Sequence, residues 1–159
     1  MKRTEYYKVA EHVFEVSSET FYNNYKPFLT EKTDTPLFSL EVFRESLSGV
    51  FAHEISQEEE GQAIVCGHTE DGKSVFEFWL DDKKAGVLIT PSDYKNNVLY
   101  VENGFEKFSV DNALMIIYAL STASKSTLLF HSSVIVYGGK AYMFLGKSGT
   151  GKSTHSRLW

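Results

Sequence analysis

Apolar and polar residues alternate along much of the first hundred residues, a pattern typical of strands that bury one face. Residues 36–43 (PLFSLEVF) alternate with a period of two, and residues 6–16 (YYKVAEHVFEV) are rich in β-branched and aromatic side chains. Residues 19–29 (ETFYNNYKPFL) are ambiguous, and Pro27 limits any helix there. The pattern predicts a β-rich N-terminal region.

The clearest strand pattern covers residues 61–103. Apolar runs at 61–69, 73–80, 85–90 and 96–103 are separated by polar stretches at 70–73, 81–84 and 91–97. Asp71-Gly72 favours a two-residue hairpin turn, because such turns need positive φ at both central positions. We predict an antiparallel meander, preceded by a solvated polar loop at 58–62.

The hydrophobic period changes after residue 104. Apolar residues at 110, 113, 114, 117 and 120 have the spacing of one helical face. Ser109 can cap the start of this helix, Asp111 suits the positive end of its dipole, and the Ser and Thr residues at 121–127 end it. We therefore predict a β-rich domain over 1–108 and the start of a second domain over 109–159.

Composition narrows the class of protein. The chain has 159 residues, of which 42% are hydrophobic, which is enough for one or two small domains. Its net charge is −5 with Lys and Arg spread along the chain, so no nucleic-acid stripe or membrane-binding basic face is expected. Cys66 is the only cysteine, which fits a reducing cytoplasm. No run approaches the roughly 18 apolar residues of a membrane span. We expect a cytoplasmic protein that binds neither nucleic acid nor membranes.

The C-terminal stretch 146–153 (GKSGTGKS) matches the phosphate-loop motif G-x-x-x-x-G-K-[ST]. Residues 140–145 (KAYMFL) before it predict a strand, and residues 152–159 (KSTHSRLW) can start a helix. Glycines at these positions let backbone N–H groups turn inward around a phosphate. A glycine-rich strand-to-helix turn that binds nothing is the alternative.

The motif assigns a role to several side chains. Lys152 would reach the β- and γ-phosphates of ATP, Ser153 would ligate Mg²⁺, and Thr154 could add a hydrogen bond. ATP and Mg²⁺ are therefore the expected cofactors. The expected nucleotide contacts are Gly146, Lys147, Ser148, Gly149, Thr150, Gly151, Lys152, Ser153 and Thr154.

A predicted hairpin places a histidine beside this loop. Gly138-Gly139 reads as a two-residue turn, which pairs residues whose numbers sum to 277 and sets His131 opposite Gly146. His131 could bind a metal there or act as an acid or base, or it could be a strand-end histidine bonded to backbone. The remaining histidines, which are expected to be surface or structural, are His12, His53, His68 and His155.

A histidine followed by small residues (HSS, 131–133), two short strands and then GKSGTGKST (146–154) resembles one known family. It is similar to the start of the catalytic domain of HPr kinase/phosphorylase and of its relative, ATP-dependent phosphoenolpyruvate carboxykinase. The resemblance implies His131 as a catalytic-site residue or metal ligand, Lys152 as the loop lysine and Ser153 as the magnesium ligand. It covers residues 128–159 only, and residues 1–100 resemble neither family's N-terminal domain.

The expected fold class is therefore α+β: a β-rich antiparallel region, then the first helix, hairpin and phosphate loop of a carboxykinase-like nucleotide-binding domain, truncated. In the family, later strands carry an acidic metal ligand and the catalytic carboxylate. The sequence thus predicts the N-terminal part of an ATP-binding HPr-kinase-like phosphotransferase, inactive alone, with an unknown protein or small-molecule phosphoacceptor.

Other functions stay open. The β-rich part could be a non-enzymatic interaction or regulatory module with a vestigial or sensing nucleotide loop. A transport ATPase is a weaker alternative, because a helix and a histidine-bearing hairpin precede the loop. Nearly continuous apolar runs in residues 128–145 also predict self-association, and hence a homo-oligomer.

Overall fold

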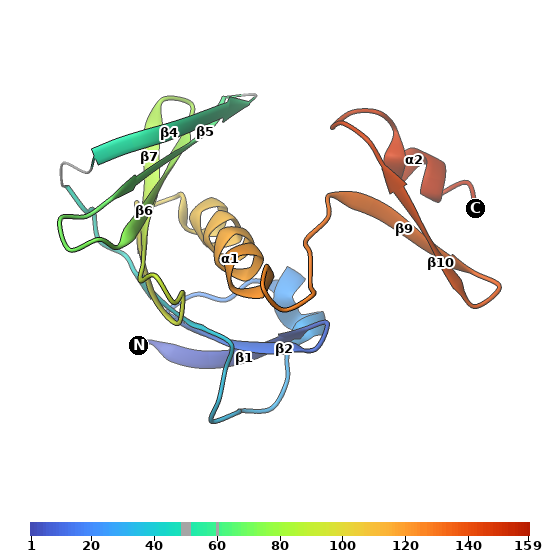
Figure 1. Ribbon diagram of the computed structural model, residues 1–159, viewed down its shortest axis with the longest axis horizontal. Helices are drawn as coiled ribbons and strands as arrows, with labels where there is room; N and C mark the ends of the chain where they lie inside the picture. Colours follow the sequence, from blue (N-terminus) through green and yellow to red (C-terminus); the bar gives the residue numbers. More distant parts are fainter. Residues whose placement is uncertain (49–51, 60) are drawn as a thin grey trace. The chain divides into compact units, whose positions relative to one another are not determined.

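The computed structural model describes residues 1–48, 52–59 and 61–159. These residues form two compact units, Met1–Ser126 and Thr127–Trp159 (Figure 1). The first unit contains a large sheet and its helix, and the second contains a hairpin and a short helix. The α+β class is confirmed.

The first unit is built on a sheet of eight strands in the order β1-β2-β3-β8-β7-β6-β5-β4. Figure 1 shows this sheet curving around helix α1 (Glu106–Thr122). A 3-10 helix, η1 (Asn23–Phe28), contains Pro27 and occupies the stretch that the sequence left ambiguous. The strands are β1 (Arg3–Val9), β2 (His12–Ser18), β3 (Ser39–Phe43), β4 (Ala52–Glu59), β5 (Gln62–His68), β6 (Ser74–Leu80), β7 (Lys83–Thr90) and β8 (Asn96–Val101).

The predicted meander is confirmed, since β5, β6, β7 and β8 pair in sequence as antiparallel neighbours. The prediction of an antiparallel region throughout is wrong. Strand β3 pairs in parallel with both β2 and β8, so the sheet is mixed. The connection over 19–38 brings the chain back to the start of β2, where Leu37 N donates to Val13 O at 2.7 Å. Alternation predicts which face of a strand is buried, but not the direction of its neighbours.

The turns differ from expectation at two places. The connection after β5 is longer than predicted, because the last pair is His68 with Ser74 and only Gly72 in the predicted Asp71-Gly72 turn has positive φ, at 79°. The two-residue turn with positive φ at both positions joins β6 to β7, at Asp81 (48°) and Asp82 (60°). Aspartate tolerates this conformation better than most residues, which explains its use here.

The predicted polar loop at 58–62 is mostly strand. Strand β4 continues through Glu59 and β5 begins at Gln62, which leaves Gly61, with a φ of 77°, in the turn. Glu60 lies outside the described residues. Acidic side chains can occupy the turn end of this hairpin because Glu58, Glu59 and Gln62 are all exposed there.

Helix α1 packs on β7 and β8 and completes the core of the first unit. The predicted apolar face is confirmed at Val110, Ala113 and Ile117, which are all buried. Other core side chains come from the strands, namely Phe14, Leu40, Phe78, Leu88 and Leu99, and from Phe38 directly before β3.

The predicted cap of α1 is wrong. The helix begins at Glu106, and Ser109 is a fully buried residue whose hydroxyl donates to Ala85 O at 2.9 Å. The helix-dipole role predicted for Asp111 is not borne out either, because Asp111 lies beyond the first turn, where the acidic residue is Glu106. Lys107 Nζ and the Tyr25 hydroxyl both donate to the Asp111 carboxylate. Ser109 instead bonds the helix to the sheet at a close contact, where a Cβ added to Gly86 would lie 2.7 Å from the serine hydroxyl oxygen.

The compact units divide after Ser126, whereas the sequence placed a boundary at 108. Helix α1 falls in the first unit because its apolar face covers β7 and β8. The second unit consists of β9 (Ser132–Tyr137), β10 (Lys140–Leu145) and α2 (Lys152–Ser156). Across the described parts of both units, no helix combines the length and apolar character needed to cross a bilayer.

Candidate functional site

The β9–β10 hairpin has the predicted register. Pairs run from Tyr137 with Lys140 to Ser132 with Leu145, and every pair of residue numbers sums to 277. Gly138 and Gly139 both have positive φ, at 57° and 72°, which the two-residue turn requires. The hairpin prediction is therefore confirmed.

The last pair of the hairpin is Ser132 with Leu145. His131 and Gly146 each lie one residue beyond this pair, at the open end of the hairpin. The side chain of His131 is exposed. The predicted opposition of these two residues continues the observed register by one step, so a catalytic or metal-binding role for His131 stays a prediction.

Residues 146–151 form the loop that leads from β10 into α2. The Thr150 hydroxyl donates to Lys147 O at 2.8 Å and closes the loop on itself. A Cβ at position 146 would lie 3.0 Å from Thr150 Oγ1, so a side chain there would crowd this closure. Gly151 precedes the helix with a φ of 81°, a conformation that favours glycine. Local geometry thus explains the motif's two outer glycines.

Lys152 folds back over the start of the loop. Its Nζ donates to Gly146 O and to Lys147 O, each at 2.8 Å. An ammonium group has three donors, so one remains for a ligand. No carboxylate pairs with it in the described part of the chain. A positive charge is therefore held over the loop by weak neutral acceptors, which an anion could replace.

The hydroxyl groups assigned to the nucleotide are accessible. Ser148, Ser153 and Thr154 are exposed on the loop and on the first turn of α2. Ser153 would be the single magnesium ligand from the motif. Among the residues that the structure describes, no cluster of three or more His, Cys, Asp or Glu side chains could hold a metal ion.

Helix α2 is anchored to the hairpin by contacts that the sequence analysis missed. Ser156 Oγ lies 2.7 Å from Ser133 Oγ, and the His155 ring packs edge-on against Phe144 at 4.7 Å. Trp159 Nε1 donates to His155 Nε2 at 3.3 Å, and its ring lies beside Tyr142. The contact between His155 and Trp159 could have been predicted from their spacing of four residues, since residues four apart share a helical face.

The second unit is basic. Residues 127–159 contain four Lys and Arg residues but none of the chain's 21 Asp and Glu residues, all of which precede residue 127. A unit with this charge attracts anions, since no neighbouring carboxylate offsets its cations. The basic residues are Lys140, Lys147, Lys152 and Arg157.

The arrangement of the second unit is thus a strand, a closed glycine loop with a lysine folded over it, and a helix tied to the preceding hairpin. These features match the phosphate-loop motif in the order that the motif requires. Comparison with family models, with curated proteins and with solved structures found no match to this chain.

Proposed function

We propose that residues 146–154 bind the phosphates of ATP with Mg²⁺, as the nucleotide loop of an HPr-kinase-like phosphotransferase. The observation that carries the proposal is the position of Lys152 Nζ on the carbonyl oxygens of Gly146 and Lys147. A lysine at this place lies over the loop into which the backbone N–H groups would bring a phosphate. The β- and γ-phosphates would replace the two carbonyls as its partners.

Each further role follows from the chemistry of the residue. Ser153 would ligate Mg²⁺ through its hydroxyl oxygen, and Thr154 would donate a hydrogen bond to a phosphate. His131, next to the loop along the hairpin register, would hold or move a proton near the γ-phosphate. The resemblance of residues 128–159 to the HPr kinase and carboxykinase family supports this assignment.

Phosphoryl transfer also needs a carboxylate to hold the metal and to orient the acceptor hydroxyl. No Asp or Glu lies within residues 127–159. Any such carboxylate would come from beyond this unit, so the unit by itself supports binding of the nucleotide and not the transfer step.

The test is calorimetric titration of ATP·Mg²⁺ into the full chain and into Lys152→Ala. Loss of a charge-assisted hydrogen bond, worth about 1.5–3 kcal/mol, should weaken binding by about 10- to 100-fold. Lys140→Ala removes an equal charge from the same unit at the hairpin turn and should leave the affinity unchanged. Equal affinity of Lys152→Ala and the parent chain would reject the nucleotide assignment.

A nucleotide-sensing module without catalysis is the second candidate, and the lack of acidic residues in 127–159 favours it. An ATP-hydrolysis assay on the same protein separates the two functions. Turnover that Lys152→Ala abolishes supports the phosphotransferase. Tight binding with turnover far below the ~1 s⁻¹ of slow kinases supports the sensor.

A further inference from the structure

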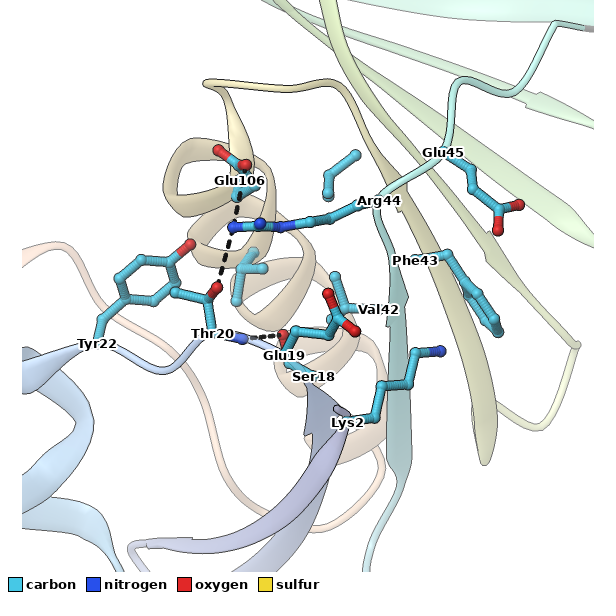
Figure 2. Close-up of a pocket in the computed structure, with 12 residues that line it drawn as sticks. Lys2, Ser18, Glu19, Thr20, Tyr22, Val42, Phe43, Arg44, Glu45 and Glu106 are labelled. Atoms are coloured by element: carbon cyan, nitrogen blue, oxygen red, sulfur yellow. Dashed lines mark hydrogen bonds and ion pairs between the residues drawn. The ribbon is translucent and has the colours of Figure 1, made fainter.

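Three parallel strands of the first unit end beside a cavity. Strands β2, β3 and β8 run in the same direction, and a cavity of about 170 Å³ lies where they end. Ser18 ends β2, Phe43 ends β3 and Val101 ends β8, and all three line the cavity. Figure 2 shows Ser18 and Phe43 at this place. In open α/β sheets, ligands bind outside the carboxyl ends of the parallel strands, and the three parallel strands here end in the same way beside a cavity. The topology therefore favours a ligand-binding site at this end of the sheet.

The cavity has an apolar floor. Val42, Val101 and Val110 line it, and each is buried in the described structure. These side chains come from β3, β8 and α1, so the floor is part of the core of the first unit. An apolar group of a ligand would be removed from water here, and the volume suits one aliphatic side chain.

The rim of the cavity carries charges of both signs. Arg44 Nη2 donates to Thr20 Oγ1 at 3.0 Å and pairs with Glu106 Oε1 at 3.2 Å (Figure 2). These contacts use one nitrogen of the guanidinium group, and in the described residues the donors on Nε and Nη1 have no protein partner. Glu106 also accepts from Gly104 N at 3.0 Å, so its carboxylate is satisfied. Arg44 thus keeps donors for an external carboxylate while its position is fixed.

Glu19 supplies the opposite charge. Among the described residues its carboxylate makes one ion pair, with the ammonium group of Met1 at 3.4 Å; the Met1 side chain is fully exposed and the Glu19 side chain is half-exposed. Such exposed pairs contribute little, so a ligand ammonium could displace this one. The other cation on the rim, Lys2, is already engaged by Glu41 at 2.9 Å and lies over the ring of Phe43.

From this juxtaposition we infer that the cavity binds a free aliphatic α-amino acid. Its carboxylate would accept from the unused donors of Arg44, its ammonium would pair with Glu19, and its side chain would lie against Val42, Val101 and Val110. The inference concerns Met1–Ser126 alone and does not depend on nucleotide binding by residues 146–154. A simple cation or anion would satisfy one charged side chain only, whereas an amino acid satisfies both.

The first experiment titrates L-valine and L-leucine into the full chain by calorimetry. Each is compared with an analogue that lacks the carboxylate (isobutylamine, isopentylamine) and one that lacks the ammonium (3-methylbutanoate, 4-methylpentanoate). We expect at least one amino acid to bind, and both of its analogues to bind at least about tenfold more weakly, since each loses a charge-assisted contact. Failure of both amino acids at millimolar concentrations, or equal binding of an analogue, would overturn the inference.

The second experiment uses a variant and a matched control. Glu19→Gln should weaken binding of the amino acid by about tenfold, because it removes the ammonium partner. The fold should be kept, since the side chain is half-exposed and the exchange of a carboxylate for an amide keeps its size. Glu11→Gln removes an exposed carboxylate from the turn between β1 and β2, at the opposite end of β2 from Glu19, and should bind as the parent does. An unchanged affinity of Glu19→Gln would contradict the inference.

Discussion

Glu77 on β6 carries a buried carboxylate, since only 2% of the residue is exposed to solvent. Lys84 Nζ donates to its Oε1 at 2.7 Å, while His53 Nε2 lies 3.1 Å from Oε2 without the geometry of a hydrogen bond. A buried charge is unfavourable unless it is paired, so these neighbours on β4 and β7 hold the carboxylate in place. The alternating pattern of β6 does not by itself predict that one of its charged residues is buried.

Removal of the lysine tests this pair. Lys84→Ala should lower the free energy of unfolding by about 2–3 kcal/mol, less than the 3–5 kcal/mol of a fully buried pair, because Lys84 is partly exposed and His53 remains. Urea denaturation gives the value, with the exposed neighbour Lys83→Ala as the control. Equal stability of the two variants would show that Glu77 does not depend on Lys84. The double variant Lys84→Met with Glu77→Gln should recover part of the free energy of unfolding that Lys84→Ala loses.

At the scale of elements, the contact between α1 and β7 is closer than side chains normally allow. Gly86 lies under the helix, where an added Cβ would be 2.7 Å from Ser109 Oγ and 2.8 Å from Tyr100 O. Ser109 reaches past this glycine to bond Ala85 O. The small residue and the buried hydroxyl together set how closely the helix approaches the sheet.

Gly86→Ala should therefore destabilise the first unit, by about 1–3 kcal/mol, because the Tyr100 carbonyl belongs to the backbone and cannot swing away. Ser109→Ala is the comparison, since it removes one hydrogen bond without a clash and should cost about 1 kcal/mol. Thermal or urea unfolding measures both. A Gly86→Ala protein as stable as the parent would mean that helix and sheet separate without cost.

The register of the β9–β10 hairpin predicts the distance between two residues beyond its last pair. Continuation of the β9–β10 register should place the Cα atoms of His131 and Gly146 within about 6 Å, the usual distance across an antiparallel pair. A crystal structure of the ATP·Mg²⁺ complex measures this distance directly. If the two residues lie far apart there, the basis for a catalytic His131 is removed, whereas the phosphate loop itself is not affected.

At the scale of the whole molecule, the second unit leaves apolar side chains in contact with water. Val136 is 76% exposed and Leu145 is 62% exposed, and the further exposed residues of the hairpin are Val134, Tyr137, Tyr142 and Met143. Both strands of a two-stranded hairpin are also edges with free backbone groups. Apolar patches with open edges mark surfaces that bind another chain.

We expect the purified chain to self-associate through this hairpin. Light scattering over a range of concentrations should show a mass above that of the monomer, and Val136→Lys should shift the equilibrium to monomer by placing a charge in the contact. Thr33→Lys, an equal change on the first unit, should not. A chain that stays monomeric at all concentrations would rule out this surface as an interface between copies.

The sequence by itself determined the features that depend on neighbouring residues. The meander over 61–103 followed from alternation, the register of β9 and β10 from Gly138-Gly139, and the order of strand, loop and helix at Lys152 from the motif. These signals act over a few residues, through φ preferences and the two periods of secondary structure. The same signals misplaced the turn at Asp71, because more than one turn satisfies a glycine at that position.

Only the tertiary structure decided which distant segments meet. The parallel insertion of β3 between β2 and β8, the burial of Ser109 and the cavity beside Arg44 all require contacts between residues far apart in the chain. The position of Lys152 Nζ on two loop carbonyls likewise depends on how the whole loop folds. The pairing of distant strands depends on how their side chains pack in the shared core, and no local pattern of hydrophobic residues encodes that packing.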